Sequence, residues 1–151
     1  MTTVTVEQVR QAGVVGAGGA GFPTHVKLSA KADTVLLNAA ECEPLLHKDK
    51  ELLRDQADGV LAGLAAAMQL VGARRAVIGV KEKYHEVIDR LRSRLGRGME
   101  LAPLRDTYPA GDEMILVYDV LGRVVPPGGL PLHVGAVVIN VETALNIALA
   151  S

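Results

Sequence analysis

The sequence predicts an α/β domain in which helices cover a mostly parallel β-sheet. Short apolar runs rich in valine and isoleucine alternate along the chain with longer stretches of helical periodicity. A length of 151 residues, 49% of them hydrophobic, is enough for the core of one domain. Four glycines in six residues, from Gly16 to Gly21, indicate a loop through which the backbone can approach a ligand closely.

Three short apolar runs are predicted to be the buried strands of the sheet. They span 34–37, 76–80 and 135–139, and each is too short for a helix. Residues 6–11 favour a helix instead. The stretch 125–131 holds three of the seven prolines and is expected to be a loop.

Apolar residues spaced three and four apart predict the helices. The spacing indicates helices over 57–71, 84–95 and 141–150, and Gly72 is expected to end the first of them. Another helix is predicted to start near Asp112. Its apolar residues expected to face inward are Met114, Ile115, Val117, Tyr118 and Leu121.

Composition excludes several classes of protein. The net charge of −1 argues against nucleic acid as a partner, and no apolar run reaches the roughly 20 residues that direct membrane insertion needs. The N-terminus has no secretory pattern, which predicts a cytoplasmic protein. The single cysteine, Cys42, excludes an internal disulfide and any cluster ligated by cysteines of this chain alone. We expect it to be a small packed residue rather than a reactive thiol.

The glycine-rich segment has three interpretations. Successive backbone N–H groups in such a loop can bind a phosphate, but the segment can also be a simple turn. Gly16, Gly18 and Gly21 also satisfy the spacing of a dinucleotide-binding fingerprint, with Glu41 twenty residues beyond the last glycine. The context argues against that fingerprint, because no clear strand precedes the loop and Pro23 would disrupt the helix expected after it.

Polar residues occur where three other predicted elements begin or end. They are Asn38, Glu41 and Glu43 after the first strand; Tyr108, Gly111, Asp112 and Glu113 before the helix near 112; and Asn140 and Thr143 at the last helix. The amide of Asn38 both donates and accepts, which suits the edge of a heteroaromatic ring. Taken alone, the two acids at 112–113 are explained by the helix dipole and Asn140 by an N-cap.

Four segments in this order resemble a known family. They are Gly18-Gly19-Ala20-Gly21-Phe22-Pro23-Thr24 with Lys27; Asn38 with Glu41-Cys42-Glu43-Pro44; Tyr108 with Gly111 and Glu113; and Asn140-Val141-Glu142-Thr143. Over about residues 12–149 the chain resembles the FMN- and NADH-binding domain of the complex I 51 kDa flavoprotein subunit family. These segments are most similar to two branches, the Rnf complex C subunit and the propanediol-utilisation cobalamin reductase. The resemblance implies a Rossmann-like three-layer fold with a glycine-rich cofactor loop.

The resemblance also implies a role for each matching position. Near FMN it places Gly18, Gly19, Ala20, Gly21, Lys27 and Asn38, with Asn140 and Thr143 on the ribityl-phosphate side. It places Phe22 and Glu43 at the adenosine end of NADH, and Tyr108, Gly111, Asp112 and Glu113 facing flavin and nicotinamide. Glu41 adds an acceptor at the same strand end as Glu43. Two positions depart from the family, because Ala17 stands where it has an arginine and Ala40 where it has an aspartate.

The implied activity is transfer of hydride from NADH to FMN, with no residue acting as nucleophile or general base. The scattered histidines, His25, His47, His85 and His133, fit no metal motif. Because this chain cannot ligate 4Fe-4S clusters, electrons would pass to an iron–sulfur domain or partner subunit. Residues 1–151 would then be the N-terminal part of a longer electron-transfer protein. The expected location is the cytoplasm, the lumen of a microcompartment or the cytoplasmic face of a membrane complex. An oligomer is compatible with the sequence. A non-catalytic scaffold domain and an ordinary NAD-binding domain are the alternatives.

Overall fold

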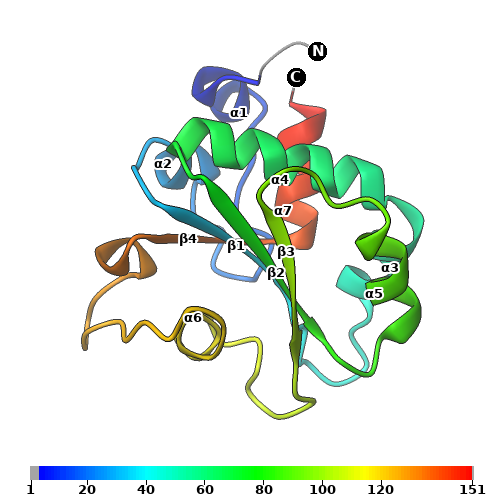
Figure 1. The fold of residues 1–151 in the computed structure, drawn as a ribbon. Helices are drawn as coiled ribbons and strands as arrows, with labels where there is room; N and C mark the ends of the chain where they lie inside the picture. Colours follow the sequence, from blue (N-terminus) through cyan, green and yellow to red (C-terminus); the bar gives the residue numbers. More distant parts are fainter. Residues whose placement is uncertain (1–3, 151) are drawn as a thin grey trace.

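A computed structural model describes residues 4–150 of the protein. Four strands form one sheet: β1 (Thr34–Ala39), β2 (Arg75–Lys81), β3 (Met99–Leu104) and β4 (Ala136–Asn140). The helices are α1 (Val6–Gln11), α2 (Thr24–Leu28), α3 (Lys48–Asp55), α4 (Ala57–Val71), α5 (His85–Arg92), α6 (Glu113–Leu121) and α7 (Val141–Leu149). A 3₁₀ turn, η1 (Pro131–Val134), precedes β4. Helices lie on both sides of the sheet (Figure 1), so the predicted three-layer α/β fold is confirmed.

The sheet is parallel throughout and has the strand order β3-β2-β1-β4. From β1 the chain builds outward through β2 to β3, then returns past α6 to add β4 on the other side of β1. The order therefore reverses between β1 and β4. In open α/β sheets the carboxyl ends of the strands at such a reversal form the usual binding crevice. Asn38 and Asn140 are register partners at this point.

Alternate strand residues face two separate cores. Val35 and Leu37 of β1 pack with α4 and α7 in the larger core, whereas Leu36 packs with Leu116 and Val117 of α6 in the smaller one. This alternation follows from the two-residue period of a strand. It also places Asn38 on the face of β1 that looks toward α6.

Helices α4 and α7 make the closest helix contact of the larger core and cross on the side of the sheet opposite α6 (Figure 1). The contact depends on Gly63, because a Cβ at this position would lie 1.7 Å from the carbonyl oxygen of Ala144 in α7. The predicted end of α4 is also confirmed, since Gly72 follows it in the left-handed conformation, with φ of 76°.

Most predicted elements are confirmed, but one strand and two helices were missed. The missed strand β3 contains Pro103 and lies at the sheet edge, where a missing N–H is tolerated. Its side chains are mostly part-exposed, so it lacks the apolar run that marks the other strands. Helix α2 has only five residues, and the apolar residues of α3, Leu52 and Leu53, are adjacent, so neither helix shows apolar residues spaced three or four apart. The loop predicted over 125–131 is confirmed except that Pro131 begins the 3₁₀ turn.

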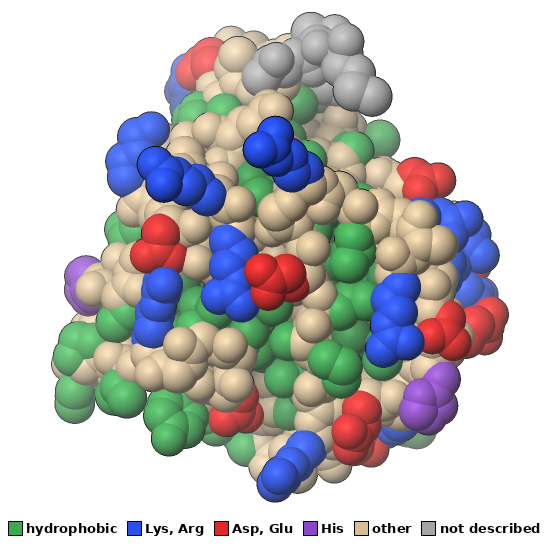
Figure 2. Space-filling model, in the orientation of Figure 1, with side chains coloured by type: hydrophobic (Ala, Val, Ile, Leu, Met, Phe, Trp, Pro, Cys, Tyr) green, Lys and Arg blue, Asp and Glu red, His purple; other side chains and the backbone are tan. Residues whose placement is uncertain are grey.

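The predicted inward face of α6 is wrong in part. Met114, Ile115 and Tyr118 are exposed, and Leu116 and Val117 are the buried residues. The helix is apolar on all sides, so periodicity could not separate its faces. Figure 2 shows apolar side chains gathered over the lower part of this view, where α6 and the segment after it lie, while charges of both signs are interspersed elsewhere.

Candidate cofactor site

A cavity of about 280 Å³ lies at the carboxyl ends of β1 and β4. It is formed by the glycine-rich loop, the ends of these two strands and the start of α6. Its lining residues are Gly16, Gly18, Ala20, Gly21, Phe22, Lys27, Asn38, Gly111, Asp112, Glu113, Val138 and Asn140. The four segments singled out in the sequence therefore meet in space at the reversal of strand order.

The glycine loop is fixed at its base and free at its tip. Val15 and Pro23 form an isolated antiparallel bridge, and the N–H of Gly16 donates to Phe22 O at 2.8 Å. The N–H of Ala17 donates to Thr143 Oγ1 at 3.0 Å. Beyond it, the N–H groups of residues 18–21 donate to no group within residues 4–150. Consecutive free donors of this kind form a concavity suited to an anion.

The two register-paired asparagines are used differently. The Nδ2 of Asn38 donates to Gly111 O at 2.9 Å, and its Oδ1 accepts from the N–H of Ala40 at 3.1 Å. This amide therefore ties the end of β1 to the segment before α6. Asn140 stands at the N-cap of α7, but its side chain makes no capping hydrogen bond. The N-cap interpretation of Asn140 is therefore confirmed for its position but not for the side-chain hydrogen bond of an ordinary N-cap.

Glycine at position 18 leaves room for the side chain of Asn140. A Cβ there would lie 2.7 Å from Asn140 Oδ1, so any side chain would push this amide aside. The uncommitted amide and the absent side chain together leave a polar recess beside the free N–H groups. Such an arrangement leaves room for a ligand rather than closing the protein on itself.

Lys27 crosses the floor of the cavity. Its Nζ donates to Val138 O at 2.9 Å and forms an ion pair with Glu113 Oε1 at 3.2 Å. Asp112 is engaged differently, since its Oδ1 accepts from the N–H groups of Met114 and Ile115 as the N-cap of α6. The structural interpretation of Asp112 is therefore confirmed, whereas Glu113 faces the cavity through its pair with Lys27.

A second, more apolar cavity of about 290 Å³ adjoins the first. The two share five lining residues: Ala20, Phe22, Lys27, Glu113 and Val138. The ring of Phe22 is 44% exposed at this junction, although aromatic side chains are usually buried. Two adjoining cavities, one polar and one apolar, suit a ligand or ligand pair with both kinds of group.

Several predicted site residues lie outside the cavity lining. Glu43 and Tyr108 are exposed, and Gly19 lies in the loop without lining the cavity. Glu41 accepts from the N–H of Asp49 at 3.1 Å and so supports the start of α3. Thr143 lies beneath the loop and holds it through Ala17. Cys42 is half-buried rather than fully buried, with its Sγ 3.1 Å from where a Cβ on Gly111 would lie, so the prediction of a small packed residue is correct only in part.

The sequence interpretation missed a charged cluster behind the loop. Lys48 Nζ lies 2.7 Å from Glu142 Oε2 and donates to Ala17 O at 3.3 Å. Beside it, Asp49 is 5% exposed, and its Oδ1 has no hydrogen-bond partner within residues 4–150. Burial, with Glu41 nearby, raises the pKa of Asp49 to about 7. No motif marked these residues, because α3 itself was not predicted.

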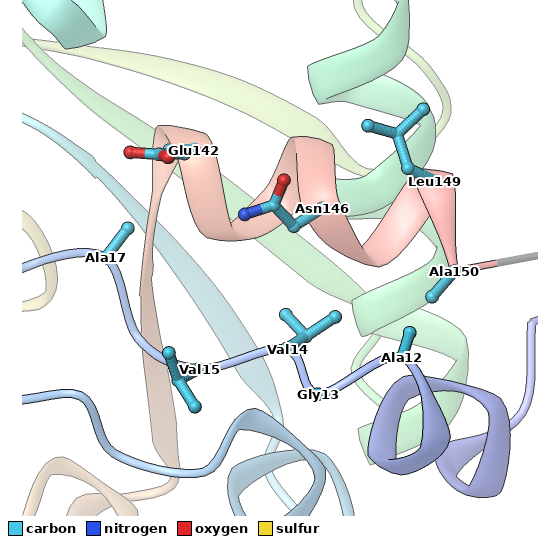
Figure 3. Close-up of a pocket in the computed structure, with 9 residues that line it drawn as sticks. All are labelled: Ala12, Gly13, Val14, Val15, Ala17, Glu142, Asn146, Leu149 and Ala150. Atoms are coloured by element: carbon cyan, nitrogen blue, oxygen red, sulfur yellow. The ribbon is translucent and has the colours of Figure 1, made fainter.

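A larger cavity, of about 550 Å³, lies between residues 12–17 and α7, and no predicted site residue lines it. Figure 3 shows the loop stretch 12–17 on one side of it and Glu142, Asn146 and Leu149 of α7 on the other. Asn146 and Glu142 are its only polar side chains among the labelled residues. It lacks the convergence of free N–H groups, amides and a lysine seen in the smaller cavity.

The alternative of an ordinary dinucleotide-binding fingerprint does not match the structure. That fingerprint requires a strand leading into the first glycine and a long helix after the last. Here α1 and a single bridge residue precede Gly16, and α2 has five residues with Pro23 as its N-cap. Glu41 is also engaged with α3. The glycine loop therefore belongs to a different cofactor-binding arrangement.

Neither a metal-binding cluster nor a membrane-spanning helix occurs within residues 4–150. No group of three or more histidine, cysteine, aspartate or glutamate side chains there could hold a metal ion. No helix in this range has both the length and the apolar composition needed to cross a membrane.

A glycine loop and an asparagine pair at a strand-order reversal define a cofactor-binding α/β domain. Comparison with known proteins gives the family. Residues 9–149 match the Nuo51 FMN-binding domain of the complex I 51 kDa family, and the chain belongs to this family. The family is one of oxidoreductase flavoproteins, and the resemblance inferred from the sequence is confirmed.

Individual relatives place the chain more closely within the family. It is 54% identical to the cobalamin reductase PduS of Citrobacter freundii, over 95% of this chain and 32% of that protein. It is 45% identical to the C subunit of the Na⁺-translocating ferredoxin:NAD⁺ oxidoreductase complex of Acetobacterium woodii, over 94% and 33%. An NAD⁺-reducing NiFe hydrogenase in its air-oxidised state superimposes with a TM-score of 0.82 at 31% identity, over 95% of this chain and 29% of that one. The chain thus spans about a third of the length of these proteins.

Proposed function

We propose that this chain binds FMN at the carboxyl ends of β1 and β4 and accepts hydride onto it from NADH. Electrons would then leave for an iron–sulfur domain or subunit. The observation that carries the proposal is the run of four free backbone N–H groups, residues 18–21, beside the uncommitted amide of Asn140. Family membership supplies the identity of the cofactor.

The residues present fit FMN chemically. The free N–H groups suit a phosphate, and the amide of Asn140 can bond to the ribityl-phosphate side. Asn38 keeps one N–H and one lone pair beyond its two internal hydrogen bonds, so it can still bond to the edge of the flavin ring. Lys27 brings a positive charge held by Val138 O. Asn38 uses only part of its hydrogen-bonding capacity within the protein, and the side chain of Asn140 makes no capping hydrogen bond. Both are expected of a site that binds a polar ligand.

When bound, FMN supplies the redox chemistry, taking up two electrons as hydride and releasing them singly. The chain's own residues bind and orient the reactants. Lys27 and Glu113 stand where the polar and apolar cavities meet, so they separate a flavin position from a position for the dinucleotide. Phe22 offers an exposed ring to the adenine there. The carboxylate of Glu43 would repel a 2′-phosphate, which favours NADH over NADPH.

The electron acceptor lies outside this chain. A cluster held by four cysteines cannot be assembled from a chain with one cysteine. The names of the relatives offer two kinds of assembly, a cobalamin reductase and an ion-translocating complex. The higher identity to the former favours cobalamin as the final acceptor.

An anaerobic titration tests the proposal. Adding FMN to the 151-residue protein is expected to quench flavin fluorescence and shift its absorption spectrum, and NADH is then expected to bleach the bound flavin. Binding of FMN without bleaching would favour a non-catalytic scaffold. Absence of FMN binding at roughly tens of micromolar, well above the affinity expected of such a site, would contradict the proposal.

A further inference from the structure

One residue of the glycine loop, Ala17, is held through both of its backbone polar groups. The N–H of Ala17 donates to Thr143 Oγ1 of α7 at 3.0 Å, and its carbonyl accepts from Lys48 Nζ of α3 at 3.3 Å. Thr143 is 2% exposed, so the first anchor is rigid. Ala17 directly precedes the four free N–H groups. The Ala17 carbonyl shares a planar peptide unit with the N–H of Gly18, so holding this carbonyl fixes the direction of the first of the four groups.

Lys48 is fixed between the loop and α7. Its ammonium lies 2.7 Å from Glu142 Oε2, in the first turn of α7. Figure 3 shows Ala17 and Glu142 facing each other across the edge of the large cavity. Burial alone would lower the pKa of Lys48, but its hydrogen bond to Glu142 and the nearby carboxylates raise it overall. The side chain therefore keeps its charge as it bridges the two elements.

The base of Lys48 is also held in place. The N–H of the next residue, Asp49, donates to Glu41 Oε2 at 3.1 Å, which secures the first turn of α3 beneath the loop. Asp49 itself is buried, with Oδ1 unpartnered within residues 4–150. A buried carboxylate without partners destabilises a fold. A buried carboxylate that costs stability is easier to explain in a region that binds a ligand than in a region that only supports the fold.

We propose that Lys48 is a positioning residue of the FMN site. By holding the Ala17 carbonyl, it aims the N–H groups of residues 18–21 at the phosphate of FMN. This inference rests on the proposed function. It differs from a surface ion pair, which would contribute only about 0–1 kcal/mol to stability and nothing specific to a ligand.

The test compares FMN with riboflavin, which lacks the phosphate. In Lys48→Met, which keeps an apolar stem of similar length, we expect FMN to bind about tenfold more weakly, the effect of losing one charge-assisted hydrogen bond. Riboflavin binding should change by less than about twofold, and Lys48→Arg should restore most of the FMN affinity. The matched control is Lys50→Met on the same helix, whose Nζ lies 5.5 Å from the Tyr84 ring and forms no hydrogen bond or ion pair with the loop within residues 4–150.

The outcomes separate the two proposals. Thermal melts of each variant check that folding is intact. If the unmodified protein binds FMN and Lys48→Met leaves that affinity unchanged, the positioning role is wrong and the proposed function stands. Equal weakening of FMN and riboflavin also overturns it, because the effect would then not act through the phosphate. Failure of the unmodified protein to bind FMN overturns both.

Discussion

Glycine has opposite roles in the contact between α4 and α7 and in the loop at 16–21. In the contact between α4 and α7, Gly63 lets two helices approach until no space remains, with Ala144 O 1.7 Å from the position of a Cβ. In the loop at 16–21, glycines leave space, and the N–H groups of residues 18–21 have no partner within residues 4–150. The first region builds stability through close packing. The second gives up hydrogen bonds and side chains so that a ligand can supply them.

The largest effect is expected from breaking the packed region. Helix propensity alone favours Gly63→Ala by about 1 kcal/mol, but the added methyl would overlap a backbone carbonyl that cannot rotate away. Overpacking of this severity should lower the free energy of unfolding by about 3 kcal/mol or more. Chemical denaturation measures it.

The control for Gly63→Ala lies one turn earlier in the same helix. At Gly59 a Cβ would meet the Cδ1 of Leu145 at 2.8 Å, which is the movable end of a side chain. Gly59→Ala should therefore change stability by less than about 1 kcal/mol, since propensity offsets the adjustment. Equal losses for the two variants would show that α4 and α7 do not depend on this approach.

A smaller effect is expected at the edge of the binding region, from Asp49. Its folded-state pKa of about 7 lies above the unfolded value, so its contribution to stability is greatest below about pH 4 and is lost as pH rises toward 7. The full shift corresponds to on the order of 4 kcal/mol above pH 7. Asp49→Asn should recover about half of this, because a buried amide without partners retains its own desolvation cost.

The pH dependence of Asp49→Asn distinguishes this cause from a general change in packing. The variant should be more stable than the parent at pH 8, about equal to it between roughly pH 5 and pH 6, and less stable near pH 4, where the parent carboxyl is neutral. Thermal or urea unfolding across this range provides the measurement. A gain in stability that is independent of pH would mean that Asp49 is not buried as a charged group. The region around the glycine loop would then lose less unfolding free energy to this carboxylate than we infer.

The two regions also differ in how far the sequence predicts them. Helix α4 and the end at Gly72 follow from apolar spacing, because a fifteen-residue amphipathic helix carries a clear period. The cavity residues were identified from a resemblance carried by loops, where spacing alone left a turn or an N-cap equally acceptable. Lys48 and Asp49 were missed because the two apolar residues of α3 are adjacent and show no helical spacing, and because Lys48 contacts residues far away in the chain. The hydrogen bonds that a side chain makes or leaves unmade depend on three-dimensional geometry that the local sequence does not determine. The capping role of Asp112 and the free amide of Asn140 are examples.

The smallest effect on stability, and the most selective on function, is expected from two glycines with the same backbone. Gly21 and Gly13 have φ of 61° and 66°, and a Cβ would meet nothing within 4 Å at either position. Alanine is equally strained at both, so each variant should lose about 1 kcal/mol of unfolding free energy. Only Gly21 lines the cofactor cavity, and we expect Gly21→Ala to weaken FMN binding roughly fivefold while Gly13→Ala leaves it unchanged. Parallel denaturation and FMN titrations measure both quantities. The backbone strain is the same in both variants, so an equal loss of FMN affinity in the two would be explained by lower stability alone. Gly21 would then have no specific role in FMN binding.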